Sequence, residues 1–272
     1  MTQNPNPPAA PAPAPVLGVL PLRFSADAPA MIAFLRTLGM AAEVTTAGED
    51  FATLVAGGGG RVMVHGADGS ETGAVPGETQ LCLAVERTDE AADALAAHDL
   101  EVRVWDETYG RQGVVVGPCG ETVSLNEQQR DLYGYEGHDG DGADPRLAVC
   151  VVRSSEEGPE READVRFFAA LGFTPVGPGD RWWQALAAPG AGVVGLHAPH
   201  PDAPAGQRAT GTEFGDVALV RLGFETDEDL EQLAARLTAA GHPARVVREE
   251  VTAVHVTDPD GLHLEIHPRS RG

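Results

Sequence analysis

The stretch FLRTLGM at residues 34–40 returns as FFAALGF at residues 167–173. In both places an apolar pattern with helical spacing ends at a glycine, which is the residue favoured just past the end of a helix. Three further landmarks recur in the same order, 132 to 141 residues later in the chain. They are Val62–His65 with Val194–His197, Thr88–Glu90 with Thr226–Glu228, and Gly120 with Gly261. Repeats that keep one order predict a tandem duplication.

Apolar periodicity predicts the same order of elements in both copies. In the first copy we expect strands at 16–24, 52–55, 61–65, 79–86, 102–107, 114–116 and 122–126, with helices at 28–38 and 90–98. In the second copy we expect strands at 147–153, 182–187, 193–197, 217–225, 244–248, 251–256 and 262–267, with helices at 161–171 and 229–240. The run Asp258-Pro259-Asp260-Gly261 predicts a type I turn between the last two strands. Helices interleaved with hairpins predict an α+β fold, with helices on one side of the sheets.

The segments outside the two copies are rich in turn-forming and polar residues. Residues 1–15 read MTQNPNPPAAPAPAP and predict a disordered Pro/Ala tail. This segment has neither a basic end nor an apolar centre, so it is not expected to be a secretory signal. The polar, glycine-rich run DLYGYEGHDGDGADP ends at residue 145 and predicts a linker over residues 130–145. The two copies then correspond to domains at 16–129 and 146–272.

Composition excludes several classes of protein. The chain has 272 residues and a formal net charge of −22, and all 19 of its basic residues are arginines. Such a charge repels nucleic acid and mildly favours a cationic ligand. No apolar run has the length of a membrane span. The three cysteines, Cys82, Cys119 and Cys150, are too far apart to predict a disulfide framework or a structural zinc site. We expect a cytoplasmic monomer or homodimer whose partner is a small molecule.

Three motifs together resemble the vicinal oxygen chelate superfamily. They are the FFAALGF helix end, the strand VVGLHAP at 193–199, and the closing run DPDGLHLEIH at 258–267. The superfamily includes glyoxalases, extradiol dioxygenases, fosfomycin-modifying enzymes and bleomycin-resistance proteins. The resemblance covers Val16 to Pro268. It implies tandem βαβββ modules that form glyoxalase-like half-barrels with helices packed outside. Metalloenzymes and metal-free binding proteins share this fold, so the fold alone does not define the function.

The resemblance also implies where a metal would lie. Enzymes of the superfamily hold a divalent metal with ligands on the first strand and on the strand before the second helix, and with a glutamate on the closing strand. The glutamate matches Glu265, but the ligand before the second helix falls on Arg221, whose guanidinium cannot ligate. The remaining places fall on Leu20, Cys82 and Ser124 in the first copy and among residues 148–150 in the second. We therefore expect no cofactor in these places. Arg221 could instead pair with Glu265 or bind an anionic or carbonyl group of a ligand.

A second arrangement keeps a divalent metal possible. Strand alternation places His263, Glu265 and His267 on one face of the closing strand. Across the tight hairpin, we expect His255 to lie roughly opposite His263. Imidazole and carboxylate groups are ordinary ligands of transition metals. His255, His263 and Glu265 are therefore the ligands expected if this protein binds a metal.

Adjacent tryptophans offer another way to hold a ligand. Trp182 and Trp183 follow each other on a predicted strand, so their side chains point to opposite faces. Aromatic rings stack on flat ligands, and one of the two is expected to line the cavity between the strands. The competing interpretation is that both rings fill the core.

The function expected from these residues is binding of a small molecule without a metal, as in the bleomycin-resistance type. Arg221, Trp182, Trp183 and His255 would contact the ligand. One alternative is a metal-dependent lyase, isomerase or dioxygenase centred on Glu265. Another is a metal-free enzyme in which Glu265 or His263 transfers a proton and Arg221 supplies positive charge.

Overall fold

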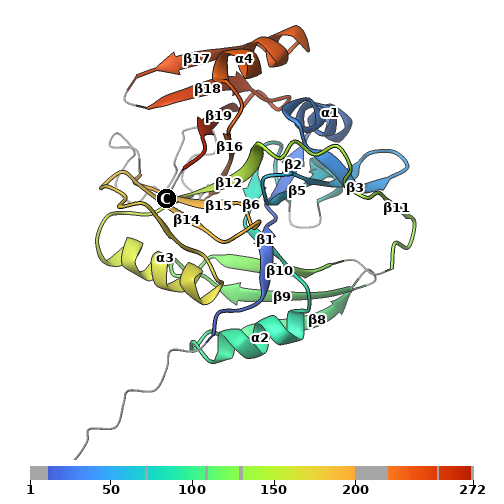
Figure 1. Cartoon of the computed structure of the whole chain (residues 1–272). Helices are drawn as coiled ribbons and strands as arrows, with labels where there is room; N and C mark the ends of the chain where they lie inside the picture. Colours follow the sequence, from blue (N-terminus) through green and yellow to red (C-terminus); the bar gives the residue numbers. More distant parts are fainter. Residues whose placement is uncertain are drawn as a thin grey trace, which may run out of the picture.

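Figure 1 shows the computed structural model of the chain, which describes residues 12–70, 73–107, 110–128, 131–199, 220–249 and 251–270. The first half contains β1 (Val16–Val19), β2 (Leu22–Ser25), α1 (Ala28–Leu38), β3 (Ala41–Thr46), β4 (Phe51–Val55), β5 (Arg61–Gly66), a short 3₁₀ turn (Ala67–Gly69), β6 (Thr79–Gln80), β7 (Cys82–Val85), α2 (Thr88–Ala96), β8 (Val102–Glu107), β9 (Gly110–Val116) and β10 (Thr122–Glu127). After β11 (Tyr135–Gly137), the second half contains β12 (Leu147–Ser154), α3 (Pro159–Ala170), β13 (Thr174–Val176), β14 (Trp183–Ala187), β15 (Val193–His197), β16 (Val220–Thr226), α4 (Leu230–Ala239), β17 (Ala244–Arg248), β18 (Thr252–Thr257) and β19 (His263–Pro268). The fold class is α+β, as predicted. None of the helices in these ranges is long and apolar enough to cross a membrane.

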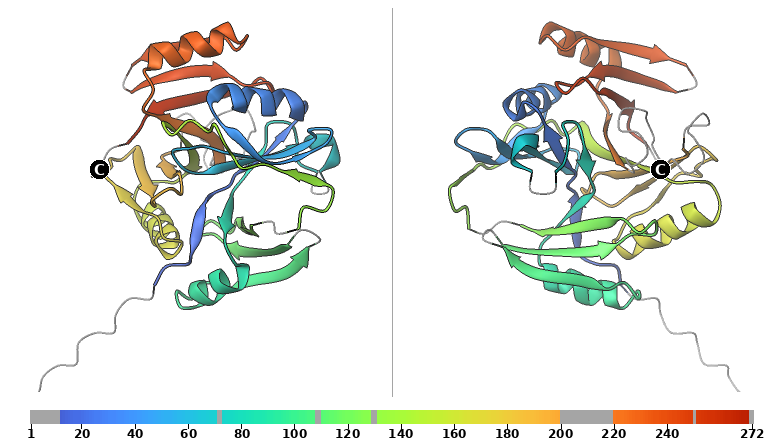
Figure 2. Two further views of the ribbon diagram at one scale, coloured as in Figure 1. Left: turned by 45° about the vertical axis from the view of Figure 1, so that its right-hand side comes forward. Right: turned by 180° about the vertical axis from the view of Figure 1, so that it is seen from behind.

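An eight-stranded sheet organises the second half. Its strand order is β13-β14-β15-β12-β16-β19-β18-β17. On one face, strand residues such as Val151, Phe224 and Ile266 join helix residues such as Phe168 and Leu237 in the main core. Because side chains alternate along a strand, Cys150 and Glu265 point to the other face. We call that side the helix-free face. Figure 2 shows α3 and α4 beside the strands from two further directions.

The first half has the same strand neighbours, but its first strand is interrupted. β1 pairs antiparallel with β7, where Val19 faces Leu83, and β2 continues the same register with β6, where Leu22 faces Gln80. Pro21 lies between β1 and β2. Proline has no N–H group for the ladder, so the strand breaks there. The continuous strand predicted at 16–24 is therefore wrong.

The two halves pack closely against each other along their first strands. A Cβ atom at Gly60 would lie 2.8 Å from the Cβ of Val149, and a Cβ at Gly192 would lie 2.7 Å from Cγ2 of Val19. Each half therefore presents a glycine on which a valine of the other half packs. Buried residues of both halves form one core cluster. The domain division at residues 129 and 146 stays a prediction, because the halves share this core.

The segments predicted to be a disordered tail and a linker both contain ordered residues. Residues 1–11 lie outside the described residues, but Ala14 is buried and its N–H donates to the carbonyl of Ala170 at 2.8 Å. The tail predicted to reach residue 15 is therefore too long. Within the predicted linker, β11 pairs antiparallel with β3 and extends that sheet. The ring of Tyr135 packs edge-on against Phe51, which gives this polar run an apolar anchor.

Candidate metal centre

The hairpin of β18 and β19 carries the three predicted metal ligands. The turn that joins the strands has a hydrogen bond from the N–H of Gly261 to the carbonyl of Asp258, and Gly261 has a φ of 84°. The predicted turn at 258–261 is thus confirmed. Across the hairpin His255 pairs with Glu265, whereas His263 pairs with Thr257. The prediction that His255 lies opposite His263 is wrong by two residues, although both pairings place His255 on the same face.

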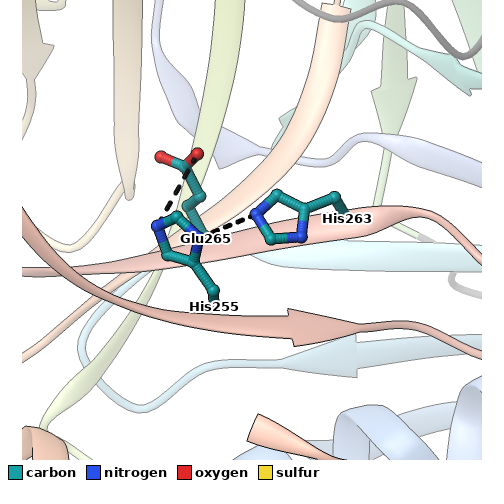
Figure 3. A group of neighbouring side chains, drawn as sticks. All are labelled: His255, His263 and Glu265. Atoms are coloured by element: carbon teal, nitrogen blue, oxygen red, sulfur yellow. Dashed lines mark hydrogen bonds and ion pairs between the residues drawn. The ribbon is translucent and has the colours of Figure 1, made fainter. Parts of the chain in front are cut away.

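Figure 3 shows that the side chains of His255, His263 and Glu265 converge. Nε2 of His263 lies 2.9 Å from Nδ1 of His255, and Nε2 of His255 lies 4.0 Å from Oε1 of Glu265. One ligand atom from each of the three residues lies within 4.8 Å of the other two. We call this group the His-His-Glu cluster. All three residues are half-buried, so solvent and a ligand can reach them.

Neighbouring groups set the protonation states in the cluster. A hydrogen bond from His267 at 3.0 Å lowers the pKa of Glu265 to about 2, against the opposing effect of burial. The positive charge of Arg221 adds to this lowering. Burial lowers the pKa of His255, and this outweighs the opposing charge of Glu265. Near pH 7 the carboxylate is therefore ionised and His255 is neutral, which are the states that metal binding requires.

Arg221 lies on β16, beside the cluster but not within it. Its guanidinium donates to the carbonyl oxygen of His263 at 3.1 Å. Arg221 therefore contacts the backbone of β19. The direct ion pair with Glu265, one of the roles that the sequence suggested, is not among the contacts between described residues. The positive charge of Arg221 still lowers the pKa of Glu265.

The two adjacent tryptophans differ in position. Trp183 packs with Cys150, Ala185 and Val193 on the helix-free face, where its ring lies over Gly195. Trp182 is 38% exposed and stacks on the guanidinium of Arg181 at 4.4 Å. The structure thus places Trp183 on the side of the cluster and Trp182 at the surface. A role of Trp182 in ligand binding stays a prediction.

The ligand places implied for the first half carry no charged group. Leu20 and Cys82 belong to a small apolar cluster, and Ser124 pairs in register with Cys82. Burial raises the pKa of the Cys82 thiol to about 11, so this thiol stays protonated. In the second half Cys150 is buried, and burial, together with the charge of Glu225, raises its pKa. Among these implied places, Glu265 is the one that offers an ionised ligand.

Sequence reasoning did not foresee the roles of two residues that support the cluster. His267 was placed on the correct face, but its bond to Glu265 was not foreseen. The other is Arg23 of the first half, which is buried and forms ion pairs with Asp258 and Asp260 in the turn of the hairpin. Residues 23 and 258 are 235 positions apart, and no local pattern links them.

The arrangement of elements is similar to that of solved dioxygenases. A fusion of a xylose isomerase-like TIM barrel with a 4-hydroxyphenylpyruvate dioxygenase matches with a TM-score of 0.60 and 16% identity. That match covers 98% of this chain, which spans 50% of the fusion protein. The chain has the fold of extradiol dioxygenases. A catechol 2,3-dioxygenase matches with a TM-score of 0.55 and 15% identity over 96% of this chain and 94% of its own length. The 2,3-dioxygenase LapB from Pseudomonas sp. KL28 matches with a TM-score of 0.58 and 12% identity over the same shares of the two chains.

Two further comparisons give no match. No family model matches the sequence, and no curated protein does. The likeness therefore shows the fold alone, and the chemistry has to be argued from the site itself.

Proposed function

We propose that this protein is a divalent-metal-dependent enzyme of the dioxygenase type that acts on a small molecule at the helix-free face of the second half. The observation that carries the proposal is the His-His-Glu cluster, whose ligand atoms lie within 4.8 Å of one another. Two histidines and one carboxylate are the donor set of non-haem iron(II) oxygenases, and they leave coordination positions open. An extradiol ring-cleaving dioxygenase from B. fuscum has a similar fold, which supports the same class of chemistry.

The residues around the cluster have separate roles in this proposal. A bound iron(II) ion would supply Lewis acidity and redox chemistry. His255, His263 and Glu265 would hold the ion through neutral nitrogens and one carboxylate. His267 bonds the second oxygen of Glu265 and so fixes the orientation of that carboxylate. Arg221 ties β16 to β19 at His263 and adds positive charge where an anionic oxygen of a substrate would bind.

Metal-free binding of a ligand is the competing function, and one observation favours it. Arg221 stands where the superfamily has a metal ligand, and its charge opposes a cation nearby. In that case Glu265 and Arg221 would contact the ligand directly. Metal titration separates the two functions, because only the first requires a cation at the cluster.

The test is anaerobic titration of the purified protein with iron(II), and with cobalt(II) as a spectroscopic probe. We expect one ion per chain, with affinity reduced about tenfold or more in His255→Ala, His263→Ala and Glu265→Ala. His98→Ala, which removes a histidine outside the cluster, is the matched control. Binding that is unaffected by all three cluster variants would contradict the metal centre. Oxygen uptake with a panel of aromatic diols then tests the dioxygenase chemistry, and a metal-loaded protein that consumes no oxygen with any of them would contradict it.

A further inference from the structure

A cavity of about 170 Å³ opens near the helix-free face, beside the ends of β12, β14, β15 and β16. Small apolar side chains make up most of its wall, among them Ala148, Ala185 and Val193. An apolar cavity of about 150 Å³ is large enough to hold a benzene molecule. The cavity therefore accepts a molecule with an apolar body of about four to six carbon atoms.

A buried carboxylate lies in the wall of this cavity. Glu225 is 3% exposed and points to the helix-free face from β16. Its two oxygens accept hydrogen bonds from Ser270, from the hydroxyl at 2.8 Å and from the N–H at 3.1 Å. Both donors are neutral. Within the part of the chain that the structure describes, no arginine or histidine lies within ion-pair distance of Glu225.

Arg269 lies in the same wall, but its guanidinium contacts groups other than Glu225. Arg269 lies 3.5 Å from the carboxylate of Asp227 and donates to the carbonyl of Gly58 at 3.1 Å. Its charge is therefore engaged by Asp227, and its guanidinium packs between the two halves. A buried carboxylate that only neutral donors satisfy is unfavourable, because buried charges are normally paired. A cation in the cavity would remove this cost.

We propose that the cavity binds a small organic ammonium ion. The ammonium group donates to the carboxylate of Glu225, and the apolar body packs on Ala148, Ala185 and Val193. The net charge of −22 raises the local concentration of such cations. This site is separate from the His-His-Glu cluster and does not depend on a metal. Glu225 pairs in register with His267, so the two sites are neighbours on one face of the sheet.

Calorimetric titration of the metal-free protein tests the proposal with isobutylammonium, cyclopentylammonium and cyclohexylammonium. The neutral alcohols and the carboxylates of the same carbon skeletons serve as matched ligands. We expect at least one of the ammonium ions to bind about tenfold more tightly than its alcohol, because hydrogen bonds to charged groups are stronger than neutral ones. The carboxylates should not bind. If no ammonium ion binds, or if alcohol and ammonium bind equally, the proposal is overturned.

Two variants locate the binding in the cavity. Glu225→Gln keeps the size of the side chain and an oxygen for Ser270, and should abolish the preference for ammonium. Ala187→Leu fills the cavity and leaves the carboxylate in place, so it should weaken ammonium and alcohol alike. Glu136→Gln removes the same charge from an exposed position on β11 and is the control. A preference that persists in Glu225→Gln, or binding unchanged in Ala187→Leu, places the ligand elsewhere and overturns the proposal.

Discussion

At the scale of single residues, Glu265 makes the stability of the metal-free protein depend on pH. The bond from His267 lowers its pKa from 4.5 to about 2. A group with a lowered pKa in the folded state stabilises the fold above its unfolded pKa, and this contribution is lost as the pH falls toward the folded pKa. We therefore expect Glu265→Gln to be less stable than the wild type at about pH 6, with a difference that shrinks between pH 4.5 and about 2. Urea denaturation at several pH values measures it. A difference that stays constant over this range would contradict the role of His267.

Strand alternation was enough to predict part of the candidate site. It placed His263, Glu265 and His267 on one face, as the structure shows. The predicted cross-strand partner of His255 was wrong because the turn sets a different register. The N–H of Asp258 donates to the carbonyl of Leu262, and this register brings His255 opposite Glu265. The strand that carries Glu225 was predicted from the sequence. The proposed binding of an ammonium ion by Glu225, however, depends on Ser270 and on a cavity formed by strands distant in the sequence. Such contacts depend on tertiary packing, which local patterns do not specify.

At the scale of elements, one glycine in each half tests how the hairpin turn controls the cluster. Gly261 and Gly120 close equivalent turns with φ values of 84° and 83°, and a Cβ at either would meet nothing within 4 Å. Gly261→Ala and Gly120→Ala should therefore each cost about 1–2 kcal/mol through backbone strain alone. Only Gly261→Ala should also weaken metal binding, because its turn joins the strands that carry His255 and His263. Chemical denaturation and cobalt(II) titration of both variants measure the two effects. Equal loss of metal affinity in both variants would contradict this account.

The elements themselves were predictable where local signals agreed. Helix α1 has the predicted bounds because Asp27 caps its first turn and Gly39 ends it with a φ of 113°. Strands β3 and β13 were missed because each follows a helix closely and has little apolar alternation. β11 was missed because its polar and glycine-rich surroundings are typical of a linker, and only its pairing with β3 makes it a strand. β11 and β13 are edge strands and β3 lies beside β11, and tertiary pairing decides the structure in all three.

At the scale of the whole molecule, each half has one buried arginine that forms ion pairs with the other half. Arg23 pairs in register with Val64, and Arg153 pairs with Leu196 in the matching strand of the second half. Arg23 binds Asp258 and Asp260 in the closing turn of the second half. Arg153 binds Glu121 in the closing turn of the first half, and also Asp164 at 3.1 Å. The buried arginine of each half thus forms ion pairs with the last hairpin of the other half.

This exchange predicts different outcomes for two matched substitutions. Arg23→Met and Arg153→Met each leave buried carboxylates without their cation, so each should lower the free energy of unfolding by about 3–5 kcal/mol. Arg23 holds the turn between His255 and His263, whereas Arg153 holds a hairpin without the cluster. Metal affinity should therefore fall in Arg23→Met and stay near the wild-type value in Arg153→Met. Urea denaturation and cobalt(II) titration test both expectations at a temperature where each variant is folded. If wild-type protein binds metal and the two variants lose affinity equally, the first half does not position the metal centre through Arg23.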